Sequence, residues 1–167
     1  MPDHRDKIMT WEQAQKRVAA LRKAGRKVVF TNGCFDLLHL GHLRYLTEAR
    51  KLGDFLVIGL NSDRSSREIK GPGRPVIPEG QRAEILAGLS VVDAVVMFDE
   101  PDPLELITSL RPNVLVKGGD WPLDKIVGRE VVEKNGGMVT TIPVTPNVST
   151  TDIISRILEL NRTDSGK

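Results

Sequence analysis

The chain has 167 residues, enough for one domain with a sizeable core, and its hydrophobic fraction of 40% is that of a globular protein. A net charge of +2 does not require a polyanionic partner, and an aromatic fraction of 4% disfavours a nucleic-acid surface built on base stacking. Cys34 is the only cysteine, so no internal disulfide can form, and no apolar run approaches the roughly 20 residues of a membrane span. We therefore expect one cytoplasmic domain over residues 1–167, with no nucleic-acid or membrane partner.

Helical and strand patterns alternate along the chain. Thr10 and Gln13 have the spacing of a capping box, which opens a helix that Gly25 ends. The polar stretch 62–78, rich in glycine and proline, predicts a long loop and the best candidate for a lid that closes over substrate. The predicted elements are a helix over 10–23, a strand over 27–32, a helix to about 52, a strand over 55–61, a helix over 79–89, a strand over 93–98, a helix over 103–110, a strand over 114–116, a helix over 129–135, a strand over 138–142 and a helix over 150–160.

This alternation predicts an α/β fold, a Rossmann-like doubly wound sheet of five parallel strands with helices on both faces and one N-terminal helix. The core covers about 7–160, and residues 161–167 are expected to form a disordered tail. Ligands of such sheets bind beyond the carboxyl ends of the strands, where the strand order reverses. Polar residues directly after strands are therefore the candidates for a site.

The segment 33–42 after the first strand is the most informative of these candidates. It holds two of the three histidines, His39 and His42, at the predicted start of a helix, where backbone N–H groups and the helix dipole favour a phosphate. Such histidines can also simply bond neighbouring carbonyls, but Gly41 between them lets the backbone approach a ligand and favours the phosphate site. A zinc site needs at least three protein ligands, and the only other histidine is His4 near the N-terminus.

Three other strand ends carry groups suited to phosphates. Lys70, Arg74 and Arg82 surround Gly71-Pro72-Gly73 and together resemble an anion clamp, although each alone could be a surface charge. Ser149 and Asp152 have the spacing of a helix cap, which also presents free N–H groups. Trp121 could stack on a base or pack against the protein, and Cys34 is expected to be a small packed residue.

The ordered set of these segments resembles the nucleotidyltransferase superfamily with a His-X-Gly-His motif, which includes glycerol-3-phosphate cytidylyltransferase. Over about residues 7–160 the resemblance is closest to the adenylyltransferase module of ADP-heptose synthesis, which in many bacteria follows a sugar kinase. Without a kinase half, the chain resembles a stand-alone D-glycero-D-manno-heptose 1-phosphate adenylyltransferase. The matching segments are Thr31-Asn32-Gly33-Cys34-Phe35-Asp36, His39-Leu40-Gly41-His42, Asn61-Ser62-Asp63, Lys70-Gly71, Arg74-Pro75, Gln81-Arg82, Val116-Lys117-Gly118-Gly119-Asp120 and Ser149-Thr150-Thr151.

The resemblance implies transfer of AMP from ATP to heptose 1-phosphate with Mg²⁺, for lipopolysaccharide or a related glycan, by a homodimer or larger homo-oligomer. It implies a catalytic set of His39, His42, Lys70 and Arg82. It implies that the nucleotide contacts Thr31, Asn32, Gly33, Cys34, Phe35, Gly41, Lys117, Gly118, Asp120, Trp121, Ser149, Thr150 and Thr151. It implies that the substrate phosphate contacts Asn61, Asp63, Lys70, Arg74 and Arg82, and that Asp36 helps to hold the metal.

Two other functions remain open at this point. A cytidylyltransferase acting on glycerol 3-phosphate or a similar polyol phosphate would keep the reaction and change the substrates. A nucleotide-binding regulatory module would use the same scaffold without catalysis, although an intact histidine pair with three loop cations disfavours it.

Overall fold

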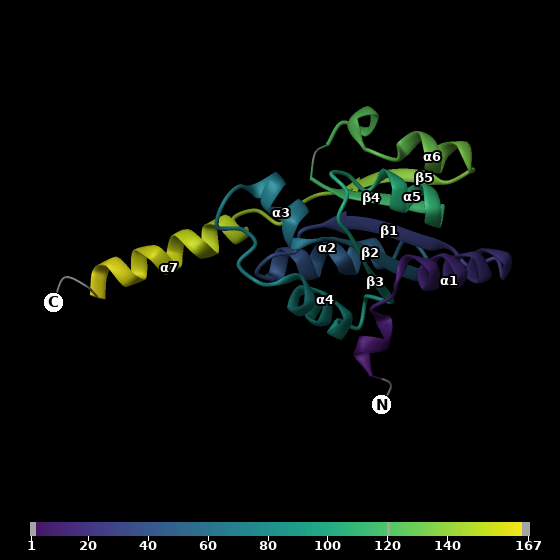
Figure 1. Ribbon diagram of the computed structural model, residues 1–167. Helices are drawn as coiled ribbons and strands as arrows, with labels where there is room; N and C mark the ends of the chain where they lie inside the picture. The colour runs from purple at the N-terminus through teal and green to yellow at the C-terminus, as the bar shows by residue number, and fades with distance from the viewer. Residues whose placement is uncertain (1–2, 120, 165–167) are drawn as a thin grey trace.

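Five parallel strands form one sheet in the order β3-β2-β1-β4-β5 within residues 3–119 and 121–164, which this computed structural model describes (Figure 1). The expected doubly wound α/β architecture with an N-terminal helix is confirmed. The elements are η1 (His4–Lys7), α1 (Trp11–Lys23), β1 (Val28–Gly33), α2 (Leu40–Arg50), β2 (Phe55–Asn61), α3 (Asp63–Lys70), α4 (Glu79–Gly88), β3 (Ala94–Phe98), α5 (Leu104–Leu110), β4 (Val114–Gly118), η2 (Leu123–Lys125), α6 (Arg129–Lys134), β5 (Met138–Ile142) and α7 (Thr150–Asp164).

The strand order reverses at β1, which pairs with β2 on one side and β4 on the other. The ladder with β2 runs the whole length of β1, from Val28↔Phe55 to Gly33↔Leu60. The ladder with β4 holds two pairs, of which Phe30↔Leu115 is the last. The two central strands therefore part toward their carboxyl ends, which is where a ligand crevice of a doubly wound sheet forms.

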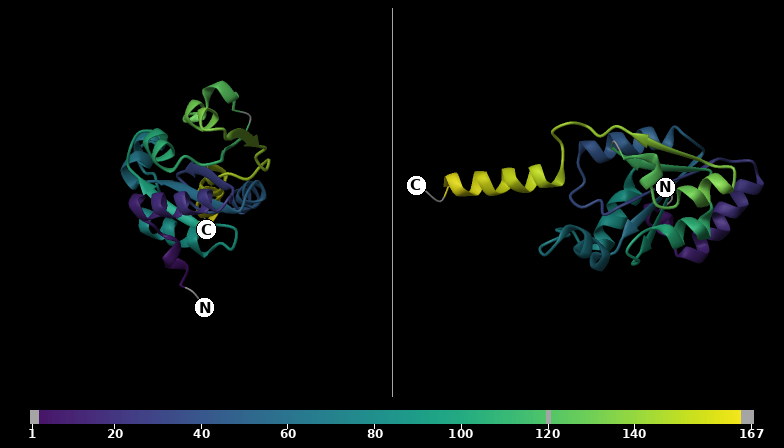
Figure 2. Two further views of the ribbon diagram at one scale, coloured as in Figure 1. Left: turned by 90° about the vertical axis from the view of Figure 1, so that its right-hand side faces the viewer. Right: turned by 90° about the horizontal axis from the view of Figure 1, so that it is seen from above.

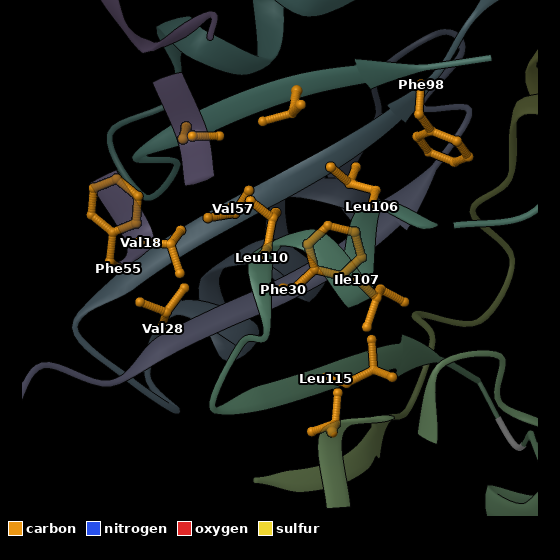
Figure 3. Packing of buried hydrophobic residues seen from close by; sticks show 14 of the residues in the cluster. Val18, Val28, Phe30, Phe55, Val57, Phe98, Leu106, Ile107, Leu110 and Leu115 are labelled. Atoms are coloured by element: carbon orange, nitrogen blue, oxygen red, sulfur yellow. The ribbon is translucent and has the colours of Figure 1, made fainter. Parts of the chain in front are cut away.

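Helices cover both faces of the sheet. On one face the buried side chains of α1, α5 and α6 pack on alternate strand residues such as Val28 and Phe30 (Figure 3). On the other face α2 and α4 pack on the intervening residues, including Val29 and Ile58. This alternation follows from the two-residue period of a strand, and the two core layers hold the sheet rigid beneath the crevice.

The stretch 62–78 is not one long loop as the sequence predicts, because its first half forms α3. Ser62 caps this helix by accepting a hydrogen bond from Ser65 N, and the helix ends at Gly71, whose φ is +91°. Its buried side chains are Ser65 and Ser66, with Asn61 Nδ2 donating to Ser65 Oγ. A helix that buries hydroxyls instead of aliphatic side chains has no apolar periodicity, so the sequence pattern does not reveal it.

Helix α7 runs to Asp164 and so includes the first four residues, 161–164, of the tail that the sequence predicts to be disordered. The helix stands away from the rest of the molecule, as Figures 1 and 2 show. Among the described residues no helix has both the length and the apolar character needed to cross a bilayer. The thirteen-residue helix α1 has the capping box between Thr10 and Gln13 that the sequence predicts.

Gly59 in the middle of β2 makes room for the buried ring of Phe30. A Cβ atom at Gly59 would lie 2.7 Å from Phe30 Cζ and 3.2 Å from Asn32 Cβ. We expect Gly59→Ala to lower the free energy of unfolding by about 1–3 kcal/mol, because the added methyl overpacks the core. Urea denaturation measures this change. Gly80→Ala is the matched control, since a Cβ there meets no atom within 4 Å and should leave stability equal or slightly higher. Equal stability of the two variants would contradict the packing argument.

Candidate active site

A cleft of about 640 Å³ opens at the carboxyl ends of β1 and β4. Four separate parts of the chain line it: the loop and helix start after β1, the α3–α4 connection, the end of β4, and the segment that enters α7. Its lining residues are Asn32, Gly33, Cys34, Phe35, Asp36, His39, Gly41, His42, Tyr45, Lys70, Arg74, Lys117, Gly118, Trp121, Val144, Thr145, Pro146, Asn147, Val148, Ser149, Thr150, Thr151 and Asp152.

The two histidines of the motif stack on each other at the start of α2. Their ring centroids lie 3.8 Å apart with 20° between the planes, and the ring of Phe35 lies 5.3 Å from that of His42. His39 is the N-cap residue of α2 but makes no side-chain capping bond. A Cβ on Gly41 would lie 3.0 Å from His39 Nδ1 and 3.4 Å from Val148 O. Glycine at position 41 therefore allows the imidazole to lie over the first helical turn.

Both imidazoles favour the neutral form in the free protein. Burial lowers the pKa of His42 to about 4, and the nearby His39 adds to this effect while Asp36 opposes it. Burial also lowers the pKa of His39, against the opposing charge of Asp152. The Nδ1 atoms of both rings are buried without a hydrogen-bond partner. Because an unsatisfied buried polar atom is costly, this pair is suited to a ligand that brings its own hydrogen-bonding groups.

Two helix N-termini meet at the cleft. In α2 the first intrahelical bond runs from Leu43 N to His39 O, and in α7 it runs from Ile153 N to Ser149 O. The N–H groups that precede these bonds have no partner within their helices. Ser149 Oγ accepts from Asp152 N at 3.1 Å, as the capping pattern in the sequence predicts. Both helices thus direct the positive ends of their dipoles toward the same space, which favours an anion.

Three cationic side chains line the cleft from three different elements. Lys70 ends α3, Arg74 follows in the loop, and Lys117 lies near the end of β4. Arg74 Nε donates to Asp36 Oδ2 at 2.8 Å, and Lys117 Nζ donates to Asn32 Oδ1 at 3.0 Å. Burial lowers the pKa of Lys117 from its ordinary value. With the helix ends, these charges give the cleft an electrostatic environment that is suited to a polyanion.

Arg82 does not line the cleft, which corrects the expectation that it contacts a substrate phosphate. The side chain is 1% exposed, and each of its three nitrogens donates to a protein oxygen. Nε donates to Ile77 O at 2.9 Å, Nη2 donates to Asp63 Oδ1 at 2.7 Å, and Nη1 donates to Cys34 O. Arg82 instead stabilises the backbone of the loop after β1 from the protein side, through its hydrogen bond to Cys34 O.

Three further predicted contacts also lie outside the cleft lining. Thr31 is fully buried, and its Oγ1 lies 2.6 Å from the hydroxyl of Tyr45. Asn61 is engaged with α3, and Asp63 is engaged with Arg82. The remaining predicted residues line the cleft, except Asp120, which falls outside the described residues.

Asp36 does not fit the role of a metal ligand, because its carboxylate is already occupied. Oδ2 accepts from Arg74 Nε and from Val76 N, both at 2.8 Å, and Oδ1 accepts from Ile77 N at 3.0 Å. Burial raises the pKa of Asp36, but these hydrogen bonds and the Arg74 charge outweigh it and hold the pKa below its ordinary value. Within residues 3–119 and 121–164, no group of three His, Cys, Asp or Glu side chains is placed to hold a metal ion.

Tyr45 and the segment 144–146 line the cleft without having been predicted. The hydroxyl of Tyr45 also donates to Val116 O at 3.2 Å, and burial raises the pKa of Tyr45 to about 12. Its position three residues after His42 places both side chains on one face of α2, a spacing that could have identified it. Val144 lies beside Gly118 and Gly119, 3.7 and 3.8 Å from the Cβ positions of these glycines.

Sequence similarity relates the chain to one family of known proteins. Residues 30–156 match the sequence model of the family described as cytidylyltransferase-like. The chain is 54% identical over 157 residues to the bifunctional protein HldE of Syntrophotalea carbinolica, covering 94% of this chain and 32% of that protein. It is 58% identical over 142 residues to the bifunctional protein HldE of Geobacter sulfurreducens, covering 85% of this chain and 29% of that protein. The chain thus spans about a third of the length of these curated relatives.

Two solved structures are similar to the fold. The lipopolysaccharide core biosynthesis protein from Thermoplasma volcanium superposes with a TM-score of 0.59 at 31% identity, over 72% of this chain and 98% of that one. Pantoate-beta-alanine ligase from Francisella tularensis has the same TM-score of 0.59 at 17% identity, over 93% of this chain and 78% of that one, which supports the fold alone. With the family match covering most of the chain and the histidine-lined crevice within it, the chain belongs to the cytidylyltransferase-like family.

Proposed function

We propose that the chain is an adenylyltransferase that transfers AMP from ATP to D-glycero-D-manno-heptose 1-phosphate, giving ADP-heptose and pyrophosphate. The observation that carries this proposal is the pair of buried, unpartnered imidazoles at a helix N-terminus inside a cationic cleft. The substrate follows from the resemblance of the motif segments to ADP-heptose synthesis and agrees with the HldE relatives. The similarity to a lipopolysaccharide core biosynthesis protein is consistent with that product.

The reaction needs alignment and charge stabilisation more than a strong base. An oxygen of the sugar phosphate attacks the α-phosphorus of ATP, a new P–O bond forms, and the bond to the β-phosphate breaks so that pyrophosphate leaves with the electron pair. The nucleophile is already an anion, so the protein must hold two polyanions together and offset the charge that develops on the transferring and leaving groups.

The residues of the cleft divide these tasks. His39 and His42 would donate hydrogen bonds to oxygens of the α-phosphate and take up charge as it develops. The free N–H groups at the start of α7, with Ser149 to Thr151, would hold the β- and γ-phosphates. Lys70 and Arg74 would bind the sugar phosphate from the opposite wall. Asn32 to Phe35 and Lys117 to Trp121 would enclose the ribose and base between them.

The Mg²⁺ that the family resemblance implies would enter with ATP, bound by triphosphate oxygens whose charge it partly neutralises. The occupied carboxylate of Asp36 argues against a resident metal on this side chain. We also propose a homo-oligomer, again from the family resemblance, with α7 standing clear of the body as the structural feature compatible with it.

A second candidate is cytidyl transfer from CTP to glycerol 3-phosphate, which the description of the matching family favours. A panel that crosses four nucleoside triphosphates with heptose 1-phosphate, hexose 1-phosphates and glycerol 3-phosphate separates the two. We expect pyrophosphate release above background only with ATP and heptose 1-phosphate. Exclusive turnover of CTP with glycerol 3-phosphate would assign the second function, and ATP binding without any release would indicate a regulatory module.

Removing either motif histidine should abolish most turnover. We expect His39→Ala and His42→Ala to lower kcat about a hundred- to a thousandfold, the usual loss when one group that stabilises transition-state charge is deleted. Continuous pyrophosphate release measures kcat, and circular dichroism verifies that the variants fold. His4→Ala is the matched control, because His4 lies in η1 and bonds Glu84 outside the cleft. Near-normal turnover of either motif variant would remove the histidines from the mechanism.

The lowered pKa of His42 predicts an acid-sensitive fold. Between the pKa of about 4 in the folded protein and the ordinary value of 6.5, the unfolded chain binds a proton at His42 that the folded chain does not. The free energy of unfolding should therefore fall as the pH is lowered from 6.5 toward 4. Urea denaturation across this range should show a weaker pH dependence for His42→Gln than for the parent chain.

Saturating pyrophosphate should raise the pKa of His42, which proton NMR measures. An unliganded pKa near 6.5 would contradict the burial argument.

A further inference from the structure

One buried residue, Asp36, connects three of the segments that line the cleft. Asp36 follows β1 and is 3% exposed, and its side chain accepts from Arg74 Nε and from the N–H groups of Val76 and Ile77. Its main-chain carbonyl accepts from Thr150 Oγ1 at 2.7 Å. These partners lie 38 to 114 residues away in the sequence. Asp36 therefore joins the histidine loop to the α3–α4 loop and to the start of α7.

The carboxylate of Asp36 is not suited to contact a phosphate itself. It is an acceptor-only group in a cleft proposed for polyanions, and an exposed anion there would repel both substrates. Three donors within 3.0 Å stabilise it instead, and one of these donors, the guanidinium of Arg74, also neutralises its charge. Any effect of Asp36 on phosphate binding must therefore pass through the groups that it holds.

Arg74 is the group through which this effect would reach substrate. Its side chain is 18% exposed and lines the cleft, and its Nε is the atom that donates to Asp36. A guanidinium held by Nε can still present the edge formed by its two terminal nitrogens to a phosphate. Fixing the long side chain before binding also avoids part of the entropy that an arginine loses when it is immobilised by a ligand.

We propose that Asp36 is a positioning residue whose carboxylate orients Arg74 relative to His39 and His42, so that the acceptor phosphate lies in line with the α-phosphate. The proposal deepens the adenylyltransferase function and rests on it. Asp36 supplies no proton and no metal bond in this role. Its charge and its fixed geometry act on the acceptor substrate through Arg74.

A double-mutant cycle of Asp36→Asn and Arg74→Ala tests the coupling. We expect Arg74→Ala to raise the KM for heptose 1-phosphate about ten- to a hundredfold, as expected for loss of a charged hydrogen bond. Asp36→Asn should raise it about tenfold in the parent chain but less than about twofold in the Arg74→Ala background, because the partner is then absent. The KM for ATP should stay within about twofold throughout. Additive effects, or an equal rise in the KM for ATP, would overturn the proposal.

The magnesium dependence separates positioning from metal binding. The Mg²⁺ concentration that gives half-maximal rate should be the same for Asp36→Asn and the parent chain. A tenfold increase would assign Asp36 to the metal and overturn the positioning role. Asp54→Asn is the matched control: Asp54 likewise accepts from a backbone N–H, of Lys27, and pairs with Arg26, at the amino ends of β1 and β2. It should leave both KM values unchanged.

Two further measurements keep the result decisive. If Asp36→Asn does not fold, Arg74→Lys replaces it, since lysine keeps the charge but lacks the planar group that Asp36 orients. Arg74→Lys should then raise the KM for the acceptor as Arg74→Ala does, and parent-like kinetics would overturn the proposal.

If the parent chain releases no pyrophosphate from any substrate pair, the proposed adenylyltransferase function is wrong, independently of the role of Asp36. Calorimetric titration of the four cycle proteins with inorganic phosphate then tests the coupling, which non-additive losses of affinity support and additive losses refute.

Discussion

The parting of β1 from β4 is the constraint on which the cleft depends. Their ladder ends at Phe30 and Leu115, while β1 stays paired with β2 to its last residue. Tyr45 spans the opening strands with a hydroxyl that contacts Thr31 Oγ1 and donates to Val116 O, so the backbone groups exposed there are partly satisfied. Because β1 leads to α2 on one face of the sheet and β4 leads to α6 on the other, the loops that follow these strands form opposite walls. The crevice is thus a consequence of strand order.

The electrostatics of the cleft are built from fixed dipoles and cations, with the histidines kept neutral. Protonation of both stacked imidazoles would place two positive charges side by side and is unfavourable, and burial lowers the pKa of each. A bound triphosphate would change this balance, since its negative charge favours the imidazolium form. The imidazoles can therefore become protonated when a phosphate binds, while the free protein avoids the unfavourable burial of two imidazolium charges.

Two ion pairs, each with one almost fully buried member, stabilise the walls of the cleft from the protein side. Arg82 holds the main chain of Cys34 and Ile77 together with Asp63, and Asp36 holds Arg74 and two loop N–H groups. Both are charged groups in the motif set, and both direct their atoms mainly toward protein. Removing one partner of such a pair leaves an uncompensated charge, so these residues also constrain the geometry of the site.

The sequence alone was sufficient for the order of the strands and of all helices except α3 and the short helices η1 and η2, for the parallel sheet, for the cap of α1 and for the location of the cleft at the strand ends. These features are local or periodic: an apolar run marks a buried strand, and a hydroxyl three residues before an amide or acid marks a helix start. Helix α3 escaped prediction because its buried face carries Ser65 and Ser66, and the roles expected for Arg82 and Asp36 could not be separated from those of Lys70 and Arg74. Whether a charged side chain faces the crevice or the protein depends on partners such as Asp63 or Val76, which lie 19 and 40 residues away in the chain. Only the tertiary structure brings those partners within hydrogen-bond distance, and that proximity decides which of the motif charges remain free for substrate.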